Sequence, residues 1–145
     1  SDFHSRIWNY AETSFREYKS AKALVEFHRK EGFKVEHGVA RAEMPVGPQH
    51  LTPTGFMHGA AVVGIADTVC GAGCQGSKPD GAIGFTTIEL KCNFLGTATS
   101  GTITCDARMI HGGRNTQVWD ADVARDDGKV IASFRCTQMV LWPKP

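Results

Sequence analysis

The stretch FMHGAAVVGIADTVCGAGCQG, residues 56–76, decides the fold class of this chain. It consists almost entirely of small and apolar residues, and it is too long for an average strand. A helix that is apolar nearly all round is one that the rest of the protein buries, so we expect a central buried helix here. The glycines in the stretch lower its helix propensity, and close packing against a sheet is the simplest compensation.

After this stretch the sequence alternates between apolar and polar residues, which is the pattern of half-buried strands. Four such segments follow one another, at residues 83–95, 101–111, 115–125 and 129–142. In the first segment one face holds Ile88, Leu90, Cys92 and Phe94, and the opposite, polar face holds Thr87, Glu89, Lys91 and Asn93. In the last segment one face holds Val130, Ala132, Phe134, Cys136, Gln138 and Val140.

The order of elements predicts an α+β fold in which an antiparallel sheet wraps around the central helix. Residues 33–46 precede that helix and are expected to form one strand, and residues 49–55 a loop rich in turn formers. Apolar residues at spacings of three and four predict an amphipathic helix in the N-terminal part. We therefore expect a helical extension over residues 1–32 and one domain over residues 33–145.

Composition excludes several classes of protein. The 145 residues are 41% hydrophobic and 21% charged, with a formal net charge of +1. This balance is that of a soluble globular domain and favours neither nucleic acid nor a membrane as partner. The five cysteines form no CxxC pair and have no histidines at matching spacing, so we expect buried thiols in a reducing, cytoplasmic setting and no metal site.

Two features of the buried helix are candidates for chemistry. Asp67 stands among apolar neighbours, where a carboxylate is either paired for structural reasons or held beside a reacting atom. His58 and Gly59 begin the same helix, where backbone N–H groups lack intrahelical partners and suit a developing oxyanion. Helix capping is the alternative role for His58.

Three stretches of the sequence resemble a known family: GFMHGAAVVGIADTVCG, TTIELKCNFLGTA and IHGGRNTQVWDADVARDDGKVIA. They are similar to the hotdog-fold acyl-CoA thioesterases of the phenylacetate-pathway (PaaI-like) family. The resemblance extends over residues 33–141. It implies the hotdog fold, hydrolysis of acyl-CoA thioesters without a cofactor, and a homodimer or a dimer of dimers, that is, a tetramer. The small residues along the helix, Ala60, Ala61, Gly64 and Gly71, either leave room for an aryl or medium-chain acyl group or face a packed sheet that fills the same space.

The resemblance also implies roles for individual residues. His58 and Gly59 would polarise the thioester carbonyl, and Asp67 would act as nucleophile or general base. In the family this carboxylate faces the His-Gly element of the partner subunit. Thr87 would position water or the carboxylate.

Further along the resemblance, the Gly-Arg turn falls on Gly113 and Arg114, which with Thr68 are expected to bind substrate. Thr52 stands where the family commonly has an asparagine, and Ala60 replaces a second glycine. We retain Thr52 as a candidate site residue.

Two other functions remain open at this stage. One is a non-catalytic hotdog protein that binds an acyl thioester as sensor or carrier, which the replacement at Thr52 favours. The other is a hotdog hydratase or dehydratase, which requires an Asp/His pair in one site. The nine-residue spacing of His58 and Asp67 does not supply such a pair within one subunit.

Overall fold

A computed structural model describes residues 33–145. The helix predicted within residues 1–32 lies outside the described residues. The described elements are, in chain order, β1 (Lys34–Glu36), β2 (Val39–Pro45), the 3-10 helix η1 (Pro48–His50), α3 (Gly59–Ser77), β3 (Gly84–Phe94), β4 (Thr102–Gly112), β5 (Thr116–Ala124) and β6 (Val130–Leu141).

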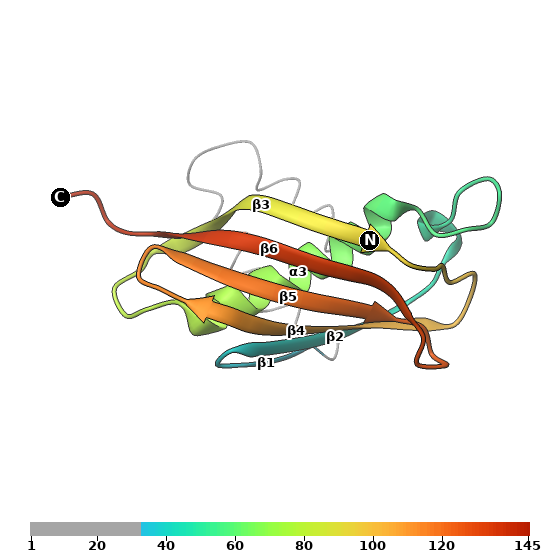
Figure 1. Ribbon diagram of the computed structural model, residues 1–145, viewed down its shortest axis with the longest axis horizontal. Helices are drawn as coiled ribbons and strands as arrows, with labels where there is room; N and C mark the ends of the chain where they lie inside the picture. Colours follow the sequence, from blue (N-terminus) through green and yellow to red (C-terminus); the bar gives the residue numbers. More distant parts are fainter. Residues whose placement is uncertain (1–32) are drawn as a thin grey trace.

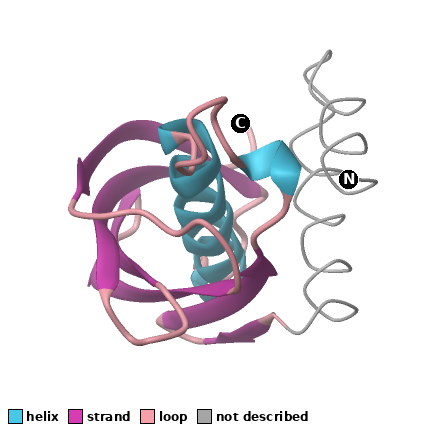
Figure 2. Cartoon of the chain, turned by 90° about the vertical axis from the view of Figure 1, so that its right-hand side faces the viewer, coloured by secondary structure: helices cyan, strands magenta, loops and turns pink. Residues whose placement is uncertain are grey.

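The six strands form one sheet in the order β1-β2-β4-β5-β6-β3, and the pairs are antiparallel. The sheet curves around α3, which runs along its inner face (Figures 1 and 2). This is the hotdog architecture, and it confirms the predicted α+β class. The four strands predicted after the helix are also confirmed, and each of their bounds differs from the prediction by one residue.

The central helix forms where residues 56–76 predict it, and most of it is buried. Its C-terminal half is enclosed from Val69 to Cys74, whereas Ala60, Gly64 and Thr68 lie on a face that stays at least partly exposed. The prediction of a helix buried all round is therefore correct for the second half and wrong for the first. The reason is that a single sheet can cover only one side of a helix, so the opposite side stays exposed unless another element packs on it.

Residues 33–46 form a hairpin rather than the single strand that the sequence predicts. Strands β1 and β2 pair from Lys34↔Arg41 to Glu36↔Val39, with His37 and Gly38 at the turn. Gly38 has φ +79°, a conformation that side chains other than glycine rarely adopt. A two-residue turn ending in glycine explains why the alternation in this segment is imperfect.

The faces of β3 differ from the prediction because of a bulge. The register of β3 against β6 shifts between Thr87 and Glu89, so Ile88 is an extra residue. One inserted residue exchanges the two faces of a strand. Thr87 therefore points inward like Leu90 and Cys92, and not to the opposite face.

Strand β3 lies at the edge of the sheet, and within residues 33–145 it pairs with β6 alone. Much of its predicted core face is exposed: Ile88 is 50% exposed, Leu90 43% and Phe94 55%. A long apolar edge strand invites pairing with another chain unless it is covered.

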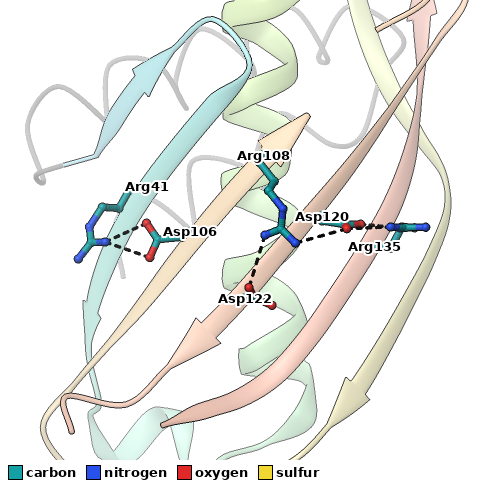
Figure 3. A network of polar contacts seen from close by, with 6 residues as sticks. All are labelled: Arg41, Asp106, Arg108, Asp120, Asp122 and Arg135. Carbon is teal, nitrogen blue, oxygen red and sulfur yellow. Dashed lines mark hydrogen bonds and ion pairs between the residues drawn. The ribbon is translucent and has the colours of Figure 1, made fainter. Parts of the chain in front are cut away.

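The charged side chains of the strands gather on the outer face of the sheet (Figure 3). Arg41 forms two hydrogen bonds of 2.9 Å with Asp106, and Arg135 donates to Asp120 at 2.8 Å. Arg108 lies 3.4 Å from Asp122. These pairs are largely solvent-exposed, so each contributes little to stability. Because the charged side chains of these pairs lie on the outer face, they do not enter the core between the sheet and the helix.

The helix approaches the sheet closely at Gly73. A Cβ atom built at this position would lie 2.5 Å from the ring of Trp119, which is fully buried on β5. At Gly64, by contrast, a Cβ atom would have no neighbour within 4 Å. Gly73 thus lies in a close-packed part of the helix surface, and Gly64 lies in an open part.

We expect Gly73→Ala to destabilise the fold by about 1–3 kcal/mol, because the methyl group overpacks the contact with Trp119. Gly64→Ala is the matched control, and it should be neutral or stabilising by up to about 1 kcal/mol through helix propensity. Chemical denaturation of both variants measures the difference. Equal effects at the two positions would contradict the packing argument.

Candidate functional site

Asp67 is the one charged residue of a largely apolar helix. It lies in the middle of α3 and is half-buried, with Ala66 fully buried beside it. The hydroxyl of Thr87 on β3 donates a hydrogen bond of 3.1 Å to Asp67 Oδ1. The bulge at Ile88 is what turns Thr87 toward the helix. The structure therefore brings together two of the residues that the sequence singled out.

Burial raises the pKa of Asp67 above its usual range, and the hydrogen bond from Thr87 opposes this rise. Burial dominates because taking a carboxylate out of water disfavours its charged form. Such a carboxylate holds its proton more tightly than an exposed aspartate. A raised pKa brings the group closer to the range in which a general base works best.

The His58–Gly59 element begins the helix as the sequence predicts. His58 is the N-cap residue, and its own N–H donates to His50 O at 2.8 Å. Its side chain makes no capping hydrogen bond and is exposed, so the capping role considered for it is not observed. Gly59 follows as the first helical residue, beside the ring of Phe94. Backbone N–H groups in this first turn have no acceptor four residues back in the helix.

Asp67 and Gly59 are far apart within one chain. Eight residues separate them along α3, which at 1.5 Å per residue corresponds to about 12 Å. One reacting carbonyl must lie about 3 Å from its oxyanion donor and near its base. The two groups of a single chain therefore cannot act on the same carbonyl.

Thr52 lies in the loop before the helix and turns toward that loop. Its hydroxyl hydrogen-bonds the Thr54 hydroxyl at 2.8 Å, and its N–H donates to Phe56 O at 2.7 Å. In the same loop the Nδ1 atom of His50 accepts a hydrogen bond from the Gly47 N–H at 2.9 Å. Thr52 thus stabilises a turn between η1 and α3.

The remaining candidates lie elsewhere. Gly113 and Arg114 form the turn between β4 and β5, where the Arg114 guanidinium stacks 4.1 Å from the ring centre of Trp142. The Trp142 indole N–H donates to Arg114 O at 3.0 Å. Thr68 is half-buried next to Asp67 on α3. Thus Asp67 and Thr87 are in contact and Thr68 follows Asp67 along the helix, whereas the Gly-Arg turn forms a separate feature with Trp142.

One residue near Asp67 was not singled out from the sequence. Gln138 on β6 is fully buried, and its Oε1 lies 3.0 Å from the Thr87 hydroxyl. The sequence contained a signal for it, because Gln138 interrupts the apolar face of the last strand. A buried amide requires hydrogen-bond partners, and it therefore marks a polar site.

Within residues 33–145 no three His, Cys, Asp or Glu side chains come together as a metal site. Over the same residues no helix has the length and apolar character needed to cross a membrane.

Comparison with known proteins identifies the class. The sequence model of the thioesterase superfamily matches residues 54–132. A 1,4-dihydroxy-2-naphthoyl-CoA hydrolase of Listeria monocytogenes is 31% identical over 103 residues, 71% of this chain and 83% of that protein. A putative esterase of Pseudomonas aeruginosa is 35% identical over 69% of each chain. The crystal structure of a mutant thioesterase from P. aeruginosa superposes with a TM-score of 0.72 at 27% identity, covering 90% of this chain and 96% of the other.

The chain therefore belongs to the thioesterase superfamily. Within it, the chain is a hotdog-fold enzyme of the PaaI-like type, and its reaction is the hydrolysis of a thioester. The chain is therefore assigned to the thioester hydrolases and not to the hydratases or dehydratases that the sequence left open. This assignment leaves the roles of the individual site residues to be proposed.

We expect Asp67→Asn to stabilise the protein at pH 7. An unfolded aspartate titrates near about pH 4. The folded pKa of Asp67 is higher, so the folded state retains a proton that the unfolded state releases, and stability falls as the pH rises through this window. The amide carries no charge and avoids this loss.

Thermal unfolding at pH 7 and at pH 3.5 measures the effect: the advantage of Asp67→Asn should shrink at the lower pH. Asp122→Asn, on the exposed outer face, is the control and should change the unfolding midpoint little. A variant that is less stable than the wild type at pH 7 would mean that the Thr87–Asp67 contact outweighs the burial of the charge.

Proposed function

We propose that this enzyme hydrolyses acyl-CoA thioesters with an aryl or medium-chain acyl group, and that Asp67 is its general base. The observation that carries the proposal is the half-buried Asp67 carboxylate, oriented by the Thr87 hydroxyl at 3.1 Å. The helix α3 contains no other carboxylate.

The proposed reaction begins when Asp67 takes a proton from water as the water oxygen bonds to the thioester carbonyl carbon. The carbonyl oxygen becomes an oxyanion, which the backbone N–H of Gly59 stabilises at the positive end of α3. The intermediate then collapses, the C–S bond breaks with its electron pair on sulfur, and the thiolate takes a proton from Asp67. The products are a free acid and CoA.

Two observations support the proposed preference for an aryl or medium-chain acyl group. The partly open face of α3 carries the small residues Ala60, Gly64 and Thr68, which leave space beside Asp67. A relative that is 31% identical is named as a hydrolase of a naphthoyl-CoA, an aromatic acyl thioester. An aromatic ring stacked along small residues would exclude water from one side of the reacting carbonyl.

A site shared between two subunits is part of the proposal. About 12 Å separate Gly59 from Asp67 within one chain, so a donor from one subunit and a base from the other must meet. The exposed apolar edge of β3 supports pairing of two copies, because β3 carries Thr87 and ends at Phe94 beside Gly59. Pairing at this edge would cover both features at once.

A binding protein without catalysis is the alternative that the sequence left open, and the thioester hydrolases among the relatives favour catalysis over it. Thr52 replaces the amide that the resembled family commonly has, and its hydroxyl is engaged with Thr54 at 2.8 Å. With that contact in place the Thr52 hydroxyl is directed at its own loop. Binding of acyl-CoA without release of thiol is the outcome that would identify this function.

We expect Asp67→Asn to reduce hydrolysis by about 100-fold or more, the scale of a lost general base. The measurement is the release of CoA thiol from a panel of aryl and medium-chain acyl-CoAs with a thiol reagent. Asp122→Asn, which removes an exposed carboxylate of the outer face, is the control and should keep wild-type activity. Near wild-type hydrolysis by a folded Asp67→Asn enzyme would show that Asp67 is structural.

The shared site is tested by mixing two inactive variants. Gly59→Pro removes the proposed N–H donor while retaining the helix, because proline is well accepted at the first helical position. Loss of one oxyanion donor should lower kcat by about 100-fold to 1,000-fold. After exchange of subunits with Asp67→Asn, mixed dimers carry one intact site, and about a quarter of wild-type activity should return for a two-fold dimer.

Gly59→Ala is the matched control for this experiment. Alanine brings the same Cβ atom toward the Phe94 ring, at 3.0 Å, but keeps the backbone N–H. It should therefore retain most activity. No recovery in the mixture after verified exchange would contradict a site built from two subunits.

A further inference from the structure

A row of polar side chains crosses the inner face of the sheet beside Asp67. Thr87 on β3 pairs with Gln138 on β6, and Gln138 pairs with Gln117 on β5. Gln138 is 0% exposed and Gln117 is 1% exposed. Two neighbouring glutamines in an apolar core require specific partners, because an unpaired buried amide is costly.

The two glutamines have different partners: Gln117 contacts the C-terminal end of the helix, and Gln138 contacts the hydroxyl that reaches Asp67 in its middle. The Gln117 amide donates to Ser77 O at 3.0 Å, and its Oε1 accepts from the Trp119 indole at 2.8 Å. These bonds tie β5 to the C-terminal turn of α3. Gln138 instead lies between Thr87, at 3.0 Å, and the thiol of Cys136, whose Sγ is 3.4 Å from Nε2.

The number of available protons limits how the hydrogen bonds from Asp67 through Thr87 and Gln138 to Cys136 can be arranged. The Thr87 hydroxyl has one proton but faces two acceptors, Asp67 Oδ1 at 3.1 Å and Gln138 Oε1 at 3.0 Å. If Asp67 is neutral, it donates to Thr87, Thr87 donates to Gln138 Oε1, and the amide donates to Cys136. Every group in this arrangement has a partner.

When Asp67 is charged, the chain must run in the other direction. A carboxylate only accepts, so Thr87 donates to Asp67 and presents a lone pair to Gln138. A half-turn of the amide then directs its NH₂ group at Thr87 and its Oε1 at the Cys136 thiol, which donates. The two protonation states of Asp67 thus correspond to the two orientations of one buried amide.

We propose that Gln138 is a positioning residue for the hydrolysis, because its amide commits the Thr87 proton to the charged Asp67 carboxylate. In this orientation Gln138 stabilises the ionised base and fixes the oxygen that Thr87 contacts, which leaves the other oxygen for water. The inference rests on the proposed role of Asp67 as general base.

The ionisable groups around this chain are thiols. Cys70 on α3 interacts with Asp67, Cys136 and Cys105 on β4, and a hydrogen bond with Cys136 together with burial raises its pKa. Burial likewise raises the pKa of Cys105. The charged side chains of β2, β4, β5 and β6 point to the outer face (Figure 3), and Glu89 of β3 accepts a hydrogen bond from Thr137 there. Lys34 and Glu36 of β1 are exposed. Thr87 is thus the group in this core that donates a hydrogen bond to the Asp67 carboxylate.

The test is a double-mutant cycle between Gln138→Met and Thr87→Val. Methionine has nearly the shape of glutamine but cannot donate. Each single variant should lower kcat about tenfold, the factor that corresponds to one hydrogen bond, with KM changed less than about twofold. Because Gln138 acts through Thr87, the double variant should be no slower than Thr87→Val alone.

Gln117→Met is the matched control, because it removes a buried amide one strand away that does not contact Thr87. It should lower the unfolding temperature. The factor by which Thr87→Val lowers kcat should be the same with and without Gln117→Met. Gln138→Leu is the second variant if Gln138→Met does not fold. It also lacks a donor for Thr87 and should lower kcat by about the same factor.

A readout without activity separates this proposal from the proposed function. The carboxyl signal of ¹³C-labelled Asp67, assigned by its loss in Asp67→Asn, reports its titration directly. Gln138→Met should shift that titration to higher pH, and Gln117→Met should not. An unchanged titration, or losses of kcat that multiply with those of Thr87→Val, would overturn the role of Gln138. Failure of Asp67→Asn to lose activity would overturn the proposed function, while the titration would still decide the hydrogen-bond chain.

Discussion

The close approach of α3 to the inner face of the sheet is the constraint on which the rest of the structure depends. The ring of Trp119 occupies the space in which a side chain at position 73 would lie. A glycine on the helix makes room for this large ring, and small residues on the sheet allow close contact at other positions. The strands accordingly present buried alanines to the helix, at Ala40, Ala42, Ala107, Ala121 and Ala132.

A core packed so closely has no place for unpaired charge, and this explains where the polar groups lie. The strands place their arginines and aspartates on the outer face (Figure 3). Asp67 is the exception, and its burial raises its pKa at the expense of stability. In a thioester hydrolase the same burial makes the carboxylate a stronger base. The hydroxyl of Thr87 and the amide of Gln138 moderate this conflict between stability and chemistry.

The single helix and single sheet also leave the described chain incomplete in a specific way. The sheet covers one side of α3, so the N-terminal half of the helix and the apolar edge of β3 remain partly exposed. These are the regions that carry Asp67, Thr87 and Gly59. The geometry of a straight helix separates the proposed donor and base within one chain, and in the proposed association of two copies they would meet.

The sequence by itself determined the buried helix, the four strands after it, and Asp67 with His58–Gly59 as candidates. These features follow from local patterns: composition, period-two alternation, and a lone charge among apolar residues. Tertiary structure alone decided the β1–β2 hairpin, the inward direction of Thr87 and the contact of Gln138 with Thr87. The inward direction of Thr87 depends on one extra residue at Ile88, and a bulge is defined by the register between β3 and β6, which lie 48 residues apart at Glu89 and Thr137. No local pattern in either strand specifies how the two align, because the alignment is set by the packing of both strands on the same helix.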